Sequence, residues 1–126
     1  MQQLKKISTT SAPKAIGPYS QAITVGNFLF TSGQIPLDPV TGEMVGCTIT
    51  EQTEQVMKNL SAILQEGGSD FAKAVKTTCF LANMSDFASF NAVYSKYFTE
   101  NPARSCVAVK ELPKGALVEV EVIAII

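Results

Sequence analysis

Histidine is absent from this sequence of 126 residues, and arginine occurs only once, at Arg104. Histidine is the commonest metal ligand and the usual general base at neutral pH, so its absence excludes Ser–His and Cys–His nucleophile pairs. A general base must here be a carboxylate, a lysine, a tyrosine or a cysteine. Because no histidine can complete a zinc site, we expect no metal.

Long apolar runs and clustered basic residues are also missing. No segment approaches the roughly 20 apolar residues that a membrane span requires, and residues 1–6 lack the apolar core of a signal peptide. The lysines are scattered and the net charge is −1, so no basic stripe is available to bind a phosphate backbone. We therefore expect a cytoplasmic protein that binds neither membranes nor nucleic acid.

Cysteine is scarce as well. Cys47, Cys79 and Cys106 are odd in number and far apart, without the C-x-x-C spacing of zinc or redox motifs. We interpret them as reduced thiols that are buried for structural reasons. What the chain does contain is 46% hydrophobic and 17% charged residues, which is enough for one globular domain over residues 1–126 with a sizeable core.

Apolar patterns predict six strands and two helices. Gly26-Asn27 separates two β-rich runs and is typical of a hairpin turn. Thr48 and Glu51 have the spacing of a capping box, and Gly67-Gly68 ends the helical repeat that follows. Ser85 is a candidate cap for a second helix, whose aromatic face we interpret as core. The expected strands are residues 5–8, 21–25, 28–32, 75–81, 104–109 and 117–126, the first helix is residues 50–67, and the aromatic face is Phe87, Phe90, Tyr94, Tyr97 and Phe98.

The predicted order, β-β-β-α-β-α-β-β, is that of an α+β fold with two helices on one face of a mixed six-stranded sheet. The last strand carries apolar residues on both faces, because its side chains alternate. Two helices cover only one face, so we expect the other face to pack against a second subunit in a homo-oligomer. One face of this strand is formed by Val118, Val120 and Val122, and the other by Glu119, Glu121, Ile123 and Ile125.

Arg104 lies in an apolar, strand-like run, where its rigid fork of donors needs a carboxylate or phosphate partner. If the last two strands are neighbours, Arg104 lies within reach of Glu119 and Glu121. One interpretation is a structural ion pair. The other is a site in which the guanidinium holds a small acid while a glutamate orients or deprotonates water. The spacing does not distinguish the two glutamates, and their pattern is also that of a solvated strand face.

Two glycine-containing segments flank the second and third strands. Gly17-Pro18-Tyr19-Ser20 precedes the second strand, and Ser32-Gly33-Gln34 follows the third. A glycine lets a backbone N–H or carbonyl group approach a ligand closely. Each segment is therefore either part of a binding site or an ordinary turn.

Together these segments resemble the Rid or YjgF family, the reactive intermediate deaminases, and within it the RidA-like imine deaminases. The resemblance covers nearly the whole chain, in the family's order and spacing. The matching segments are Ile16-Gly17-Pro18-Tyr19-Ser20-Gln21-Ala22, Thr31-Ser32-Gly33-Gln34-Ile35-Pro36, Thr41-Gly42-Glu43, Gln52-Thr53, Asn59-Leu60, Lys76-Thr77-Thr78, Phe87, Asn91, Tyr94, Pro102-Ala103-Arg104-Ser105-Cys106-Val107, Leu112-Pro113-Lys114 and Val118-Glu119-Val120-Glu121.

The resemblance implies a chorismate-mutase-like, YjgF-like fold assembled as a homotrimer, with ligand sites in clefts between subunits. It also implies hydrolysis of 2-iminopropanoate and 2-iminobutanoate, which pyridoxal-phosphate dehydratases release from serine and threonine, to 2-keto acids and ammonia without a cofactor. Arg104 matches the arginine that grips the substrate carboxylate, and Glu119 matches the carboxylate that positions the attacking water. Positions that line the cleft are matched by Tyr19, Ser32, Gly33, Asn91 and Cys106.

Two other functions are open. One is a regulatory module that holds a small carboxylate through Arg104 without turning it over, and the other is a ribonuclease or translation inhibitor, an activity attached to some family members. One arginine, no histidine and a negative net charge do not favour the latter. We expect no covalent role for Cys106, because no histidine and no nearby helix N-terminus is available to lower its pKa.

Overall fold

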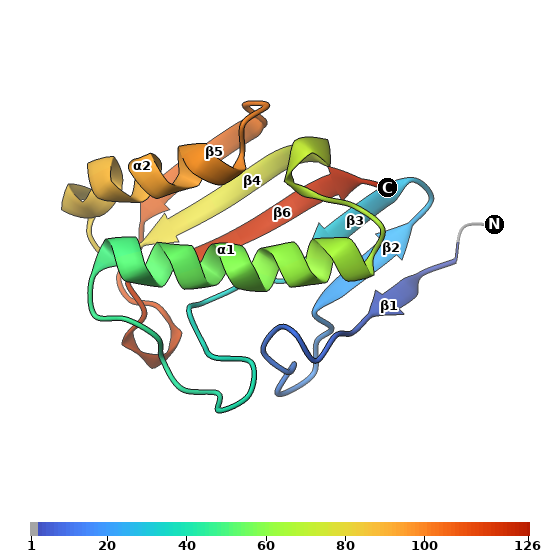
Figure 1. Cartoon of the computed structure of the whole chain (residues 1–126), viewed down its shortest axis with the longest axis horizontal. Coiled ribbons are helices and arrows are strands. Elements are labelled where there is room, and N and C mark those ends of the chain that lie inside the picture. The colour runs from blue at the N-terminus through green and yellow to red at the C-terminus, as the bar shows by residue number, and fades with distance from the viewer. Residues whose placement is uncertain (1–2) are drawn as a thin grey trace.

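Six strands and two α-helices form the framework of residues 3–126, the part of the chain that the computed structural model describes (Figure 1). Their order is the predicted one, and three short 3-10 turns, which the sequence patterns did not predict, lie between them. The elements are β1 (Lys5–Ile7), β2 (Ala22–Val25), β3 (Phe28–Thr31), α1 (Ile49–Glu66), β4 (Ala74–Leu81), α2 (Phe87–Tyr97), β5 (Ala103–Ala108) and β6 (Val118–Ile125).

The strands form one mixed sheet in the order β1-β2-β3-β6-β4-β5. All neighbours are antiparallel except β4 and β5, which are parallel. β5 and β6 are therefore not neighbours, and the condition under which Arg104 would lie within reach of Glu119 and Glu121 is not met. The connection through α2 is a crossover that places β5 parallel to β4, and β6 then pairs with the other edge of β4, so that β4 separates the last two strands.

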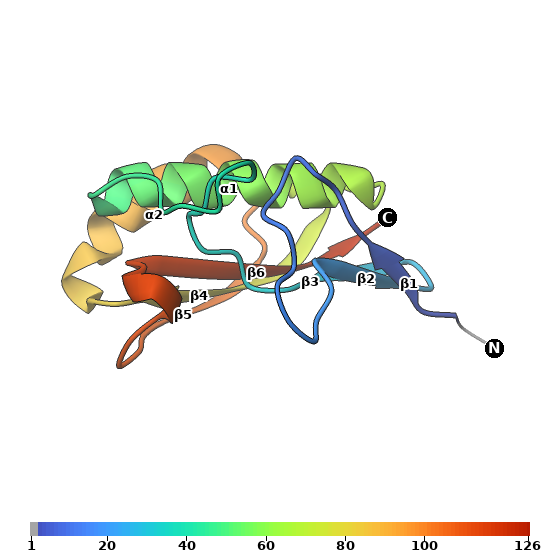
Figure 2. The ribbon, with the colours of Figure 1, turned by 90° about the horizontal axis from the view of Figure 1, so that it is seen from below.

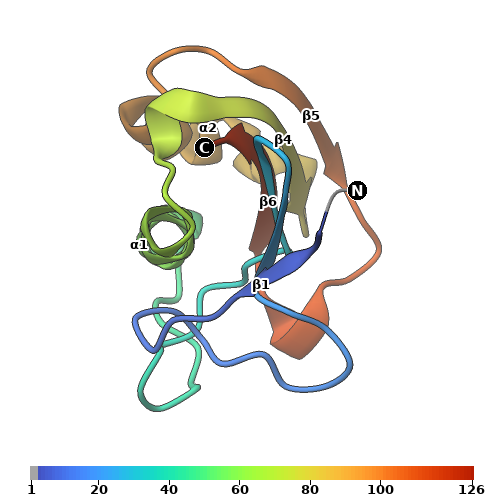
Figure 3. The ribbon, with the colours of Figure 1, turned by 90° about the vertical axis from the view of Figure 1, so that its right-hand side faces the viewer.

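Both helices lie over the same face of the sheet, as predicted. Viewed from its edge, the molecule has two layers, with α1 and α2 above the sheet (Figure 2), and the end-on view shows α1 beside the curved sheet (Figure 3). Thr48 caps α1 as expected: its hydroxyl accepts from the Glu51 backbone N–H at 3.2 Å, and the Glu51 carboxylate accepts from the Thr48 N–H. In residues 3–126, neither helix is long and apolar enough to cross a membrane.

Ser85 does not cap α2. Residues Met84–Asp86 form a 3-10 turn, so that α2 begins only at Phe87, and its N-terminus receives no side-chain cap. The predicted aromatic face is confirmed as part of the core for Phe90, Tyr94 and Phe98, which are buried between α2 and the sheet. Phe87 and Tyr97 are only partly covered.

Strand β6 alternates between the two faces as the sequence predicted. Val118, Val120 and Val122 are buried under the helices, and Glu119, Glu121 and Ile123 are half-buried on the opposite face, which we call the outer face. The strand register aligns further apolar side chains with them on this face, and in residues 3–126 no helix covers it. These side chains are Ile23, Val25, Phe28, Phe30, Phe80, Val107, Ile123 and Ile125.

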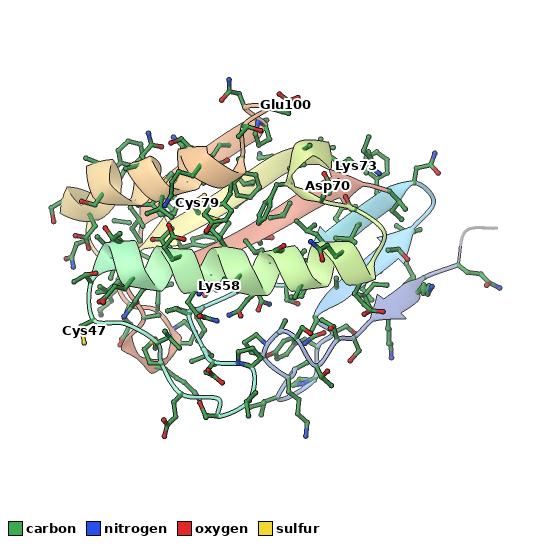
Figure 4. The ribbon with its side chains drawn as sticks, viewed as in Figure 1. Cys47, Lys58, Asp70, Lys73, Cys79 and Glu100 are labelled. Atoms are coloured by element: carbon green, nitrogen blue, oxygen red, sulfur yellow. The ribbon has the colours of Figure 1, made fainter. Side chains whose placement is uncertain are left out.

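The cysteines are free thiols. Cys79 is fully buried and Cys106 is half-buried, but Cys47 is exposed on the loop before α1, at the edge of the molecule (Figure 4). The expectation of burial is therefore wrong for Cys47, because the loop that carries it runs outside the two layers.

Two buried amides fasten the loops that surround one end of the sheet. Gln21 donates to the carbonyls of Thr9 and Pro13 at 3.1 and 2.8 Å and accepts from the Thr9 N–H at 2.7 Å. Asn59 on α1 donates to the carbonyls of Ile35 and Leu37 at 3.3 and 3.0 Å. The segment between β3 and α1 has few buried apolar side chains, so the hydrogen bonds from Asn59 help to hold its conformation.

We expect Asn59→Leu to lower the free energy of unfolding by about 1–3 kcal/mol, because two carbonyl groups in the loop would each lose one hydrogen bond. The Ile35 carbonyl still accepts from the Leu37 N–H, and the Leu37 carbonyl from the Gln55 side chain. Urea unfolding at one fixed protein concentration measures the change. The neighbouring Lys58→Ala, at an exposed position of the same helix, serves as the control and should stay within about 0.5 kcal/mol of the parent. An equal loss in both variants would show that the amide bonds do not hold the loop.

Candidate functional site

Arg104 lies on β5 and points to the helix-covered side of the sheet, because it pairs in register with the buried Thr77. Its Nη1 donates to Oδ1 of Asn91 at 2.6 Å. The guanidinium also lies over two rings, with its Cζ 4.7 Å from the centre of Tyr94 and 5.5 Å from that of Phe87. Such cation–π contacts orient the plane of the fork.

Helix α2 supplies these partners because Phe87, Asn91 and Tyr94 follow one another at helical spacing and so share a face. A cavity of about 410 Å³ opens beside Arg104, and its wall includes Asn91, Asn101 and Pro102. A guanidinium has five N–H donors, and the bond to Asn91 uses one of them. Donors therefore remain for a bidentate contact to a carboxylate.

Glu119 lies on the outer face and lines a different cavity, of about 560 Å³. Tyr19, Ser32 and Gly33 line the same cavity. The segment after β3 is held beside β6 by paired backbone bonds between Gln34 and Val120, at 2.9 and 3.2 Å. This pairing places Gly33 directly against the glutamate.

Gly33 leaves room for the Glu119 carboxylate in its present position. A Cβ at this position would overlap Oε2 of Glu119 and lie 2.8 Å from its Cδ. Ser32 is fixed by its hydroxyl, which donates to the Ser20 carbonyl at 2.5 Å. Tyr19 follows Gly17, whose φ of 119° favours glycine, and is 52% exposed, so its ring is available to a ligand.

Burial raises the pKa of Glu119, and the neighbouring Glu121 carboxylate raises it further. A carboxylate with a raised pKa is a better proton acceptor near neutral pH than an ordinary surface glutamate. Burial likewise raises the pKa of Cys106, which keeps this residue a thiol and does not favour a nucleophilic role. Cys106 lies two residues after Arg104 on the same strand and lines neither cavity.

The structure separates the two residues that the sequence analysis placed together. Arg104 and Glu119 lie on opposite faces of the sheet, two strands apart and three residues out of register, which corresponds to roughly 10 Å in each direction. Arg104 forms no ion pair within residues 3–126, where the only bridge joins Lys96 and Glu54. A structural ion pair between Arg104 and either Glu119 or Glu121 of the same chain is therefore excluded. A site that uses both Arg104 and Glu119 of one chain is excluded for the same reason.

The predicted site residues thus form two groups. Arg104 and Asn91 line the cavity beside α2, and we call them, with Tyr94, the arginine half-site. Tyr19, Ser32, Gly33 and Glu119 form the glutamate half-site. From the sequence, Tyr94 and Phe87 are expected only in the aromatic core face, although their spacing from Asn91 could have placed them beside Arg104. In residues 3–126, no group of three or more His, Cys, Asp or Glu side chains is placed to hold a metal.

A mixed sheet with two helices on one face and two cavities, each of which contains a charged side chain, defines a small α+β protein suited to binding small molecules. The sequence profile of the Endoribonuclease L-PSP family matches residues 9–126. The chain belongs to this family, which includes the Rid and YjgF proteins that its motifs resemble.

Three relatives illustrate the similarity. AldR of Lactococcus lactis, named as a candidate regulator, is 60% identical over 96% of this chain and 97% of its own. A mouse protein named 2-iminobutanoate/2-iminopropanoate deaminase is 48% identical over 96% of this chain and 90% of its own. The crystal structure of Escherichia coli TdcF with bound serine matches at a TM-score of 0.92 and 41% identity, covering 97% of this chain and 98% of the other.

Proposed function

We propose that this protein is a cytoplasmic, single-domain hydrolase that converts 2-imino acids, such as 2-iminopropanoate and 2-iminobutanoate, to 2-keto acids and ammonia. The observation that carries the proposal is the arginine half-site, where Arg104 is held by Asn91 with donors left for a carboxylate. The name of the mouse relative supports this reaction. The raised pKa of Glu119 supports a role for that carboxylate as proton acceptor.

A homotrimer would bring the two half-sites together. Within one chain they lie on opposite faces of the sheet, so a complete site needs Arg104 from one subunit and Glu119 from the next. The apolar outer face, with Phe28 at 44% and Phe30 at 40% exposure, provides the surface through which subunits would pack. A cyclic trimer with head-to-tail contacts would form three equivalent sites.

The reaction requires little from the protein because a protonated imine is already electrophilic. Arg104 would hold the carboxylate, and Glu119 would accept a proton as water attacks C2 and the C=N electron pair moves to nitrogen. The glutamate then returns this proton to the nitrogen and takes the hydroxyl proton as the carbonyl forms and the C–N bond breaks. Ammonia takes up that proton and leaves as ammonium. Proton transfer contributes about 10²–10⁴-fold, and orientation of the water adds to it. No cofactor enters these steps.

A coupled assay tests the activity. Threonine and a threonine dehydratase generate 2-iminobutanoate, and release of keto acid and ammonia is followed with and without the protein. Faster release with the parent protein, lost in Arg104→Ala, is the expected result. No acceleration by a folded protein would contradict the proposal.

Subunit complementation tests whether sites span subunits. We expect Arg104→Ala and Glu119→Gln each to be inactive alone, whereas trimers refolded from an equal mixture should recover about a quarter of the parent activity, since each mixed trimer contains one site with both residues. Mixing the two proteins without unfolding serves as the control. If refolded mixtures stay inactive while forming trimers, the two residues do not belong to one shared site.

A second candidate is a regulatory module that binds small carboxylates without turnover. The name of AldR and the serine bound to TdcF favour it. It differs from the first candidate only in whether Glu119 activates water, so binding of 2-oxobutanoate without acceleration of imine hydrolysis would support it. The family is named for a ribonuclease activity, but the composition of this chain does not favour binding to RNA, because the chain has one arginine and a net charge of −1.

A further inference from the structure

Behind Arg104, three residues form a closed circuit of contacts. Thr77 on β4 pairs in register with Arg104 on β5. Its hydroxyl hydrogen bonds to the hydroxyl of Tyr94 at 2.7 Å, and the Tyr94 ring lies 4.7 Å under the guanidinium. The strand that carries the arginine and the ring that supports its head group are therefore tied together through one side chain.

The hydrogen bond between Thr77 and Tyr94 is shielded from water. Thr77 is fully buried and Tyr94 is only 6% exposed. Burial also raises the pKa of Tyr94, so its hydroxyl stays protonated and the bond to Thr77 persists over the neutral range. The hydroxyl oxygen lies on the long axis of the ring, so this hydrogen bond fixes where the far end of the ring sits under the cation. The plane of the ring is held by Phe98, which stacks on it at 4.6 Å with an interplanar angle of 26°.

An arginine side chain has four flexible bonds, and ordering it when a ligand binds costs affinity. The bond to Asn91 fixes one nitrogen but leaves the fork free to rotate about that contact. The faces of Tyr94 and Phe87 restrict this rotation. Of these two residues only Tyr94 has a hydroxyl group, and this group hydrogen bonds to Thr77 in the sheet.

We propose that Tyr94 and Thr77 are positioning residues that set the orientation of the Arg104 guanidinium before a carboxylate binds. The inference rests on the role proposed for Arg104 and assigns the residues that prepare it. Neither residue needs to touch the substrate. Their shared hydrogen bond fixes the position of the Tyr94 ring, and the guanidinium takes its orientation from the ring in that position.

Nitrogen-15 NMR tests the inference without any assay of activity. Arg104 is the only arginine, so its Nε–Hε group gives a single identifiable resonance. In the unliganded parent protein we expect a high heteronuclear NOE, typical of an ordered side chain. Tyr94→Phe, which keeps the ring, and Thr77→Val, which keeps the shape, should both lower this NOE markedly. Ser89→Ala, at an exposed position of the same helix outside this cavity, is the control.

Kinetics in the coupled assay provide the second readout. Each single variant should raise KM by about threefold to tenfold with kcat within about twofold of the parent, because capture of the carboxylate is weakened and the chemistry is not. The double variant should lose no more than either single variant, since all three remove the same bond. Should the parent protein lack turnover, the same comparison is made with the Kd of 2-oxobutanoate, and the proposed function fails separately from this inference.

Two results would overturn the assignment. The first is an Arg104 NOE that stays at the parent value in both Tyr94→Phe and Thr77→Val. The second is a fall in melting temperature in these variants with KM and Kd no different from those of Ser89→Ala, which would make the bond structural only.

Discussion

Arg104→Lys is expected to reduce kcat/KM for imine hydrolysis by about 10²–10³-fold while the protein remains folded and trimeric. Lysine keeps the positive charge but has no planar fork, so it cannot hold a carboxylate through two parallel N–H bonds. It also loses the stacking of the guanidinium on Tyr94 and Phe87 and the defined bond to Asn91. The loss should appear mainly in KM, because Arg104 holds the substrate carboxylate equally in the bound ground state and in the transition state.

Steady-state kinetics, with light scattering after size exclusion to measure assembly, check this prediction. Lys110→Arg, at an exposed position beyond β5, is the control, because it exchanges one cationic side chain for another near the strand but outside the site. Full activity of Arg104→Lys would show that charge alone suffices and that the clamp is not the basis of recognition.

Local sequence patterns predicted the elements of this fold because their causes are local. The capping pair Thr48 and Glu51 fixed the start of α1, and the Gly26-Asn27 turn fixed the β2–β3 hairpin, in which Val25 pairs with Phe28. The alternation in β6 predicted which side chains lie under the helices. Each of these signals depends on neighbours within a few residues.

Strand order could not be predicted in the same way, because it depends on contacts between distant segments. The strong apolar character of β6 gave no indication that it would pair with β3 and β4 and leave β5 at the edge. The alternation of β5 also did not specify which face Arg104 would take. As a result the strand patterns placed Arg104 and Glu119 together within one chain, where the sheet separates them, whereas the family resemblance implied clefts between subunits.

The choice between Glu119 and Glu121 shows what the structure adds. Spacing left the two equivalent, and only the family resemblance favoured Glu119. The structure supplies a physical difference, since Glu119 lies against Gly33 in the wall of a cavity, whereas Glu121 pairs with Thr78 in the middle of the outer face and lines neither cavity. The acid–base role is therefore proposed for Glu119 on two independent grounds.

Glu119→Gln should lower kcat by about 10²-fold or more and change KM little, because glutamine can bond to water but cannot accept its proton. Its melting temperature at neutral pH should rise. The pKa of Glu119 is raised in the folded protein, so its ionised form is favoured by the unfolded state and destabilises the fold once the pH exceeds the unfolded pKa. Calorimetry at pH 7 and at pH 4 tests the sign, since the gain should shrink where the carboxyl is protonated.

Glu121→Gln is the matched control, with a different expected signature. Its kcat at neutral pH should stay within about threefold of the parent. Because the Glu121 carboxylate helps to raise the pKa of Glu119, removing it should lower that pKa. Glu119 must be ionised to accept a proton, so activity falls on the acid side, and this limb of the pH profile should move to lower pH in Glu121→Gln. Equal losses of kcat in both variants, or an unmoved acid limb, would mean that Glu119 is not the group whose ionisation controls the reaction.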